Sequence, residues 1–187
     1  TIFRTTNLSD WDSSGTVNFK VVSKGFEETS VLSLAAPPEG EVQLYSAMGD
    51  LDGFSHKDVD IVPDNQNNNG SMGSANSIAF AWKSPNIVAR SGSSTSIEIS
   101  SDYGKTWTAR KPKGSKGEAG TVSVIAAGST IYWVNDKDSR IYRTDDLGET
   151  WSTVEKAFAA PAICSDCIDP DTLYVYASGT LYISRDR

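Results

Sequence analysis

Carboxylates that could perform acid–base chemistry gather in three places. The first group is Asp50, Asp52 and Asp58 in the polar segment Gly49–Asp60. The second is the pair Asp102 and Asp146, which occupy the same position in a repeated motif. The third is the adjacent pair Glu27 and Glu28. A carboxyl group takes part in proton transfer only when its position and its pKa suit the step. Each group therefore has to be judged from the element that presents it.

The adjacent pair Glu27 and Glu28 is a poor candidate for a two-carboxylate site. Successive side chains on a β-strand point to opposite faces, so the two groups cannot address one bond unless the strand is bulged there. We do not expect this pair to act together.

The repeated pair belongs to a motif of the form S/T-x-D-x-G-x-T-W. It occurs as Ser100–Trp107 and as Thr144–Trp151, with 44 residues between the two aspartates. Arg4–Trp11 is a degenerate copy with Asn7 at the aspartate position, and Ser184–Arg187 begins another copy. A period of about 40–45 residues indicates β-propeller blades. The unfinished last copy leads us to expect that the chain is part of a longer protein.

The motif, known as an Asp box, suits a hairpin turn rather than catalysis or metal binding. The aspartate can accept backbone N–H bonds, the glycine supplies a positive φ, and the tryptophan returns an apolar ring to the sheet. These positions are Asp102, Gly104 and Trp107 in one copy and Asp146, Gly148 and Trp151 in the other. We interpret both copies as structural.

Short alternating segments separated by turns predict an all-β fold with almost no helix. The predicted strands are 31–34, 43–48, 77–82, 86–90, 96–100, 121–126, 130–134, 140–144, 151–154, 172–176 and 180–184. Four short strands per period is the pattern of a propeller blade. Residues 1–187 are thus expected to form one partial domain of about four blades. The segment Gly49–Asp60 breaks this rhythm and is expected to be a polar insert, which is where function is often placed on a rigid scaffold.

The bulk composition narrows the class of protein. With 17 basic and 24 acidic residues the net charge is −7, which argues against nucleic acid or an anionic membrane surface as a partner. No apolar run approaches the roughly 18 residues that span a bilayer. The chain starts at Thr1 rather than Met, and Asn7 and Asn69 lie in N-x-S sequons, so we expect a processed, secreted protein, while glycosylation of either asparagine stays open.

Cys164 and Cys167 form one C-x-x-C pair, and His56 is the single histidine. A zinc site needs four ligands, and a thioredoxin-type site needs a βαβ setting, so neither is expected. A tight local disulfide or two free thiols are the alternatives, and no metal or cofactor is expected.

One part of the chain resembles glycoside hydrolase family 74, the xyloglucanases and related xyloglucan-specific cellobiohydrolases. The resemblance is carried by Gly25–Leu32, Ala36–Pro38, Leu44–Asp58 and Ser84–Arg90, together with both Asp boxes. The cluster G-D-x-x-G-F-x-H, combined with E-E-T-x-V-L, is the specific part, because sialidases and sortilin-like receptors also have Asp boxes. The resemblance covers nearly the whole chain and places it in the second of two propellers.

The resemblance implies an inverting hydrolase of the β-1,4-glucan backbone of xyloglucan, made of two seven-bladed propellers with the sugar between them. Asp50 matches the family's general acid, whereas the catalytic base belongs to the first propeller and has no counterpart in these residues. Such enzymes need one protonated carboxyl group and one carboxylate about 6.5–9.5 Å apart. Burial or the nearby Asp52 and Asp58 could raise the pKa of Asp50. The isolated chain is expected to be inactive.

The sequence departs from the family at two positions near Asp50. Asp52 replaces a usual glycine, and Ser55 stands where an arginine is usual. Among possible sugar contacts, His56 could bind a hydroxyl group or orient Asp50, and aromatic rings could stack on pyranose units. The aromatic candidates are Tyr45, Trp82, Tyr132 and, as the favoured one, Trp133.

A non-catalytic propeller fragment that binds carbohydrate or protein is the alternative function. A sialidase is excluded because no F/Y-R-I-P motif occurs near the start, and a sortilin-type receptor is disfavoured because its cysteine-rich module is absent. Whether cleavage is internal or from chain ends depends on loops outside this stretch and stays open.

Overall fold

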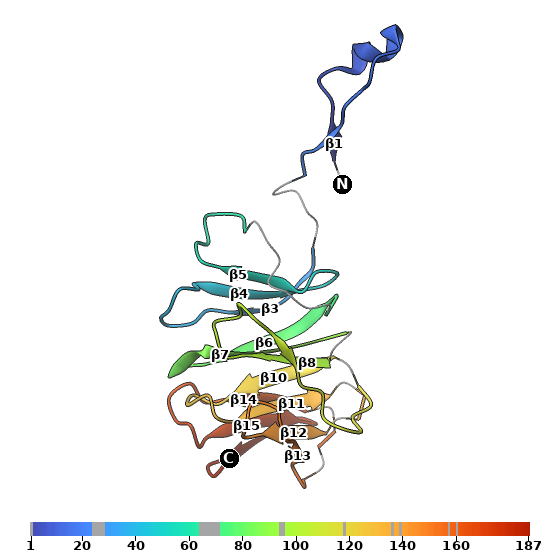
Figure 1. The fold of residues 1–187 in the computed structure, drawn as a ribbon. Coiled ribbons are helices and arrows are strands. Elements are labelled where there is room, and N and C mark those ends of the chain that lie inside the picture. Colours follow the sequence, from blue (N-terminus) through green and yellow to red (C-terminus); the bar gives the residue numbers. More distant parts are fainter. Residues whose placement is uncertain are drawn as a thin grey trace.

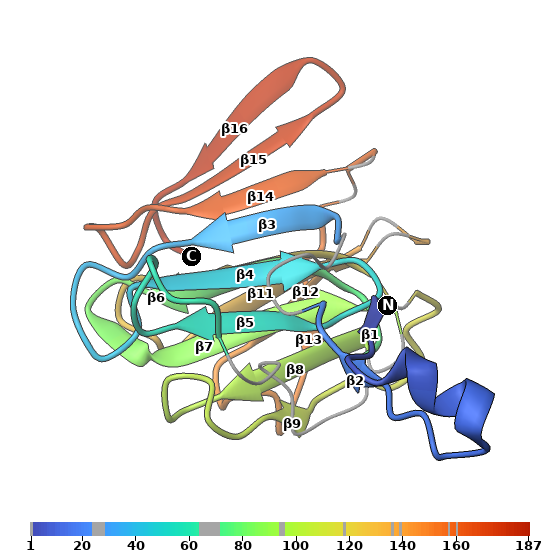
Figure 2. The same cartoon turned by 90° about the horizontal axis from the view of Figure 1, so that it is seen from above.

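The computed structural model describes residues 2–23, 29–63, 72–93, 96–117, 119–135, 137–138, 140–156, 158–159 and 161–187. Within them, antiparallel sheets follow one another along the chain as a stack (Figure 1). Seen from above, the strands of the last sheet are rotated relative to those of the first, as in successive propeller blades (Figure 2). Glu27, Glu28 and the sequon of Asn69 lie outside the described residues.

The described residues form four larger sheets in chain order. The first contains β3 (Val31–Ala35), β4 (Leu44–Met48) and β5 (Gly53–His56); the second contains β6 (Ala75–Ala81), β7 (Ser84–Gly92), β8 (Ser96–Ser100) and β9 (Thr108–Ala109). The third contains β10 (Gly120–Val124), β11 (Ile131–Asn135), β12 (Ile141–Thr144) and β13 (Ser152–Thr153); the fourth contains β14 (Ala162–Ser165), β15 (Leu173–Ala177) and β16 (Thr180–Ser184). In each sheet the strands pair in sequence order, so every connection within a sheet is a hairpin.

Each predicted strand has an observed counterpart, although several observed strands, such as β9 and β14, were not predicted, and the segment Gly49–Asp60 is not irregular throughout. It contains β5, which pairs with β4 and places Gly53 opposite Ala47. No strand was predicted here, so β5 is a feature that the structure adds to the expected polar insert. The short run Gly-Phe-Ser-His lacks a clear alternating pattern, and its strand form comes from the ladder that β4 offers.

Serine hydroxyl groups join the first strands of successive sheets. In each case a serine Oγ of one first strand accepts a backbone N–H from the next first strand. The bonds run from Ile78 N to Ser33 Oγ (3.4 Å), from Val122 N to Ser77 Oγ (3.2 Å) and from Ser165 N to Ser123 Oγ (2.8 Å). This repeated bond helps to fix neighbouring sheets against each other.

Apolar clusters fill the space between successive sheets, and the Asp-box tryptophans close two of them. Trp107 packs on the cluster between the first and second sheets, which includes Tyr45, Met72 and Phe80. Trp151 packs on the next cluster, which includes Trp133. A third cluster, formed by Ile125, Tyr132, Val134, Ile141, Ile163, Leu173 and Val175, joins the last two sheets. The core is therefore divided into layers between sheets.

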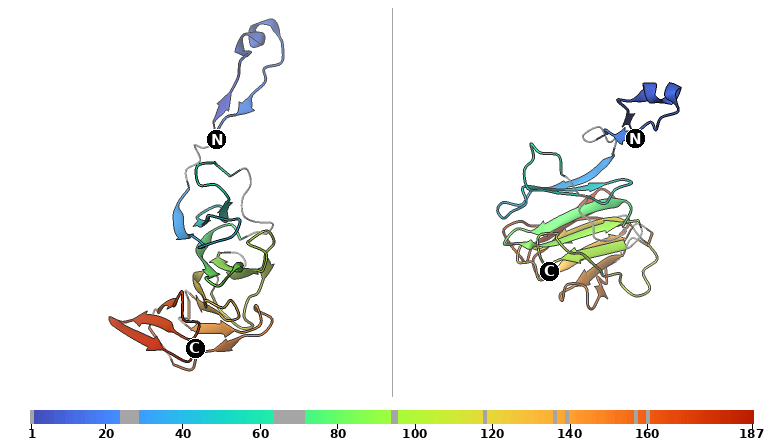
Figure 3. Two further views of the ribbon diagram at one scale, coloured as in Figure 1. Left: turned by 90° about the vertical axis from the view of Figure 1, so that its left-hand side faces the viewer. Right: turned by 45° about the horizontal axis from the view of Figure 1, so that its top comes forward.

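The N-terminal hairpin of β1 (Phe3–Arg4) and β2 (Lys20–Val21) projects away from the stacked sheets (Figure 3). Asn7 takes the aspartate position, because its Oδ1 accepts Thr5 Oγ1 (3.0 Å), but it closes the turn on Asn18 N (3.0 Å), eleven residues later. The 3₁₀ helix η1 (Leu8–Ser13) occupies the intervening chain and leaves Trp11 76% exposed. The Arg4–Trp11 copy thus forms a longer turn than the two Asp boxes. Trp11 does not pack against a sheet as Trp107 and Trp151 do.

Candidate functional site

Asp50 lies at the turn between β4 and β5, with an exposed side chain. Its backbone is left-handed, with φ of 64°, a conformation that aspartate adopts more readily than most residues. The backbone N–H of Asp50 donates to Ser74 Oγ at 2.8 Å, and that of Gly49 donates to the Ser30 carbonyl at 2.9 Å. The turn is therefore tied both to the segment before β3 and to the segment before β6.

Gly53 explains why the motif G-D-x-x-G-F needs its second glycine. Its φ is 124°, and a Cβ added there would lie 1.8 Å from the backbone oxygen of Ser46. No other residue fits without moving the paired strand. The glycine fixes where β5 begins and so where the turn bearing Asp50 ends.

Asp52, two residues after Asp50, turns into the protein and is 1% exposed. Its Oδ2 lies 3.5 Å from Nη2 of Arg90, and Nε of Arg90 donates to Glu98 Oε2 at 2.8 Å. The Arg90 guanidinium also stacks on Trp107, with Cζ 4.1 Å from the ring centroid. Burial, one of the two environments considered for Asp50, is found at Asp52, so the extra charge at the family's glycine position faces the interior.

His56 lies at the far end of β5 from the Asp50 turn. Its Nε2 is 3.2 Å from Ser46 Oγ, which also accepts the N–H of Phe54 at 3.1 Å. Burial lowers the pKa of His56. At about 3.3 Å per residue, three residues of strand separate His56 from Gly53 by about 10 Å. The ring is therefore placed to brace the hairpin rather than to contact Asp50 directly.

The aromatic candidates do not gather at Asp50. Tyr45, Tyr132 and Trp133 are at most 1% exposed, and Trp133 packs on Tyr142 with ring centroids 5.4 Å apart. Trp82 is 42% exposed but occupies the β6–β7 turn, at the end of β6. Ser74, which binds the Asp50 backbone, comes directly before the start of β6. A seven-residue strand is about 23 Å long, so Trp82 lies at the opposite end of the sheet. None of the four offers a sugar-stacking face beside Asp50 in this structure.

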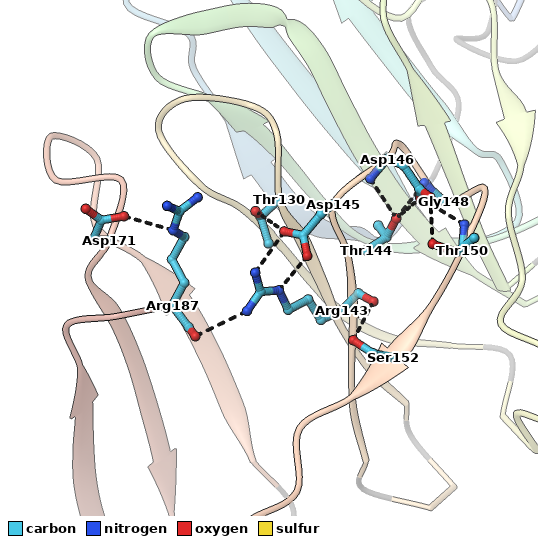
Figure 4. A network of polar contacts seen from close by, with 10 residues as sticks. All are labelled: Thr130, Arg143, Thr144, Asp145, Asp146, Gly148, Thr150, Ser152, Asp171 and Arg187. Carbon is cyan, nitrogen blue, oxygen red and sulfur yellow. Dashed lines mark hydrogen bonds and ion pairs between the residues drawn. The ribbon is translucent and has the colours of Figure 1, made fainter.

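The two Asp boxes use their carboxylates to close turns. Asp146 Oδ1 accepts the N–H of Thr150 at 2.8 Å and Thr144 Oγ1 at 2.7 Å, and its Oδ2 accepts Thr150 Oγ1 at 2.6 Å (Figure 4). These bonds, chiefly from Thr150, lower the pKa of Asp146 to about 2. Asp102 makes the same contacts with Thr106 and Ser100. Burial alone would raise the pKa of Asp102, but its hydrogen bonds lower it overall. Both carboxylates are occupied by structural bonds.

A second polar network lies beside the Asp146 turn and joins the last two sheets. Arg143 pairs with Asp145, which also accepts Thr130 Oγ1 at 2.6 Å. Arg143 Nη1 donates to the carbonyl of Arg187 at 3.3 Å, and Arg187 pairs with Asp171 (Figure 4). Every group in this network is satisfied by another protein group, so we assign it to sheet packing.

Cys164 and Cys167 are free cysteines rather than a disulfide. Both residues are exposed, but partial burial of its sulfur atom raises the pKa of Cys164. Among the described residues no three histidine, cysteine or acidic side chains converge as a metal site. In the same part of the chain, no helix has the length and apolarity to cross a membrane.

Sequence reasoning missed Ser74, Arg90 and Glu98, which support the Asp50 turn from the second sheet. Ser74 is 24 residues from Asp50, and nothing in the local sequence connects the two. The pair Arg90 and Glu98 offered a weak signal, because opposite charges occur in segments predicted to be neighbouring strands.

Curated proteins and a solved structure that resemble this chain are xyloglucanases. No family model matches it. A xyloglucanase from Paenibacillus sp is 32% identical over 98% of this chain, and one from Acetivibrio thermocellus is 33% identical over 100%. These matches cover 19% and 22% of the two relatives, so the chain spans about a fifth of their length.

A solved structure also resembles this chain. The crystal structure of the GH74 xyloglucanase from Xanthomonas campestris superposes with a TM-score of 0.78 at 31% identity, over 86% of this chain and 24% of that one. The stacked sheets are therefore blades of a β-propeller.

Proposed function

Because the chain belongs to glycoside hydrolase family 74, we propose that it acts as part of an inverting β-glucan hydrolase in which Asp50 is the general acid. The observation that carries the assignment is the presentation of Asp50. It is the exposed carboxylate at the apex of a turn held by Ser30, Ser74 and the close approach of Gly53. Fixed backbone with an exposed carboxyl group is what proton donation to a bound substrate requires.

The chemistry assigned to Asp50 is protonation of the leaving glycosidic oxygen. In an inverting mechanism a second carboxylate activates water on the opposite face of the sugar, about 6.5–9.5 Å away. From the family resemblance we expect that base in another propeller, beyond these residues. The carboxylates of Asp102 and Asp146 are engaged in turns, so we do not assign either of them the role of base.

We further propose xyloglucan as the substrate and secretion as the location. Support for the substrate comes from the relatives, which are named xyloglucanases. A polysaccharide cannot enter a cell intact, so an enzyme acting on it works outside. The partner of this chain is then the remainder of the same enzyme, including the propeller that supplies the base.

The test is Asp50→Asn in the intact enzyme that contains this chain, with release of reducing sugar from xyloglucan as the measurement. We expect turnover to fall by at least about a thousandfold while binding of xyloglucan persists, because the amide keeps the shape of the side chain but donates no acidic proton. Asp60→Asn, an exposed carboxylate outside the turn, is the matched control. Full activity of Asp50→Asn would remove Asp50 from this role. Binding without turnover in the unaltered enzyme would instead favour a non-catalytic carbohydrate-binding propeller.

A further inference from the structure

The carboxylate of Asp52 is buried, and the turn that contains it provides no group that would compensate for the burial. Its side chain is 0% exposed, and neither carboxylate oxygen has a hydrogen-bond partner among the described residues. Removing a carboxylate from water is costly unless hydrogen bonds and a counter-charge replace the water. Asp52 has only the counter-charge, the guanidinium of Arg90 at 3.5 Å.

Arg90 is already satisfied without Asp52. Its Nε donates to Glu98 Oε2 at 2.8 Å, its Nη2 also pairs with Glu98, and its face stacks on Trp107. Arg90 and Glu98 lie on adjacent strands of the second sheet, at directly opposed positions in the register. The three side chains together hold two carboxylates for one guanidinium. Asp52 is therefore a second buried carboxylate, without a hydrogen bond of its own in the described part of the chain, beside a guanidinium that is already hydrogen-bonded to Glu98.

What Asp52 adds is a link between sheets. It belongs to the turn of the first sheet, whereas Arg90 and Glu98 belong to the second. Attraction between buried charges is weakly screened and acts without exact hydrogen-bond geometry. It pulls the turn inward at residue 52, while Ser74 Oγ holds the backbone at residue 50. Two anchors on either side of Leu51 fix the direction in which Asp50 faces outward.

We propose that Asp52 is a positioning residue for the general acid, holding the Asp50 turn against the second sheet through its charge contact with Arg90. The inference rests on the proposed function of Asp50. A buried ionic group kept at a cost in stability specifies one arrangement of neighbouring elements, and here the arrangement specified is that of the catalytic turn. Asp52 touches no substrate in this role.

The experiment compares Asp52→Asn with the unaltered intact enzyme, measuring kcat and KM on xyloglucan and the urea midpoint of unfolding. We expect kcat to fall by about tenfold to a hundredfold, since a displacement of about 1 Å at a reacting group costs that much, with KM changed less than about twofold. The midpoint should stay equal or rise, because the substitution removes a buried charge that has no hydrogen bond among the described residues. A purely structural role would instead lower the midpoint.

Hydrogen exchange gives a readout that does not depend on activity. In Asp52→Asn the amide of Asp50, bonded to Ser74 Oγ, should exchange at least about tenfold faster. Glu98→Gln serves as the comparison for stability and should lower the midpoint, because it replaces a charge-assisted hydrogen bond of Arg90 with a neutral and weaker one. Asp60→Asn is the control for both rate and stability.

Parallel measurement of Asp50→Asn separates the two proposals. If Asp50→Asn abolishes turnover and Asp52→Asn leaves kcat and the Asp50 amide unchanged, the positioning role is wrong and the acid assignment stands. If Asp50→Asn is fully active, the proposed function itself fails. A lower midpoint in Asp52→Asn together with an unchanged Asp50 amide would also overturn the positioning role.

Discussion

The backbone N–H of Asp50 donates a hydrogen bond to the side-chain oxygen of Ser74 across the boundary between the first two sheets, at 2.8 Å. This bond joins the candidate acid to a residue outside its own hairpin. It satisfies a backbone donor in a left-handed residue that has no ladder partner there. The orientation of Asp50 therefore depends on how the two sheets pack.

Ser74→Ala should loosen the Asp50 turn. Loss of one hydrogen bond costs about 1 kcal/mol of unfolding free energy, and we expect kcat on xyloglucan to fall about tenfold as Asp50 samples other positions. Urea unfolding and steady-state kinetics of the intact enzyme measure the two effects. Ser152→Ala removes an exposed hydroxyl with only a 3.4 Å bond and is the control. A Ser74→Ala enzyme with normal kcat would show that this bond does not orient the acid.

Gly53→Ala should strongly destabilise the first sheet. The new Cβ meets the Ser46 oxygen at 1.8 Å in addition to the strain of a φ of 124°, so we expect a loss of at least about 2 kcal/mol in unfolding free energy, measured by urea unfolding. Gly114→Ala is the matched control, because Gly114 also has a positive φ of 81° but no heavy atom within 4 Å of its Cβ. Gly114→Ala should lower the free energy of unfolding by only about 1 kcal/mol. Equal losses in the two variants would contradict the close contact with Ser46.

Asp146→Asn should remove part of the dependence of stability on pH. Hydrogen bonds from Thr150 and Thr144 hold the pKa of Asp146 at about 2, below its ordinary 3.8. A carboxylate with a lowered pKa stabilises the fold above the unfolded value and loses that contribution as the pH falls through the folded value. Asp146→Asn should thus be less stable than the unaltered protein at about pH 7, with the difference shrinking between about pH 4 and pH 2.

Urea midpoints of the two proteins across that pH range test this, with Asp60→Asn as control. A difference that persists undiminished at about pH 2 would mean that the ionised carboxylate is not what holds the turn.

Much of the fold could be predicted from the sequence because its signals are local. The Asp-box repeat is a turn whose bonds span four residues, so its motif and its structure coincide at Asp102 and Asp146. Strands with clear alternation, such as Ser96–Ser100 and Thr180–Ser184, were predicted to the residue. The strand Gly53–His56 was missed because it is defined by its partner β4 rather than by its own pattern.

The aromatic candidates for sugar binding show that the exposure of a side chain could not be predicted from its neighbours in the sequence. Trp133 ends a predicted strand beside a polar turn, a position that suggests exposure, yet its ring is fully buried against Tyr142 between sheets. Exposure depends on which residues of the neighbouring sheet cover a side chain. No residue near Trp133 in the sequence carries that information.

The sequence by itself determined the repeat, the family and the position of Asp50, because each is encoded in residues that are neighbours along the chain. Only the tertiary structure decided that Asp50 faces outward while Asp52 is buried against Arg90 and Ser74 holds the turn. These contacts join residues 24 or more positions apart. They exist because stacking of the first two sheets brings the start of β6 and the last part of β7 beside the β4–β5 turn, and no local pattern encodes that contact.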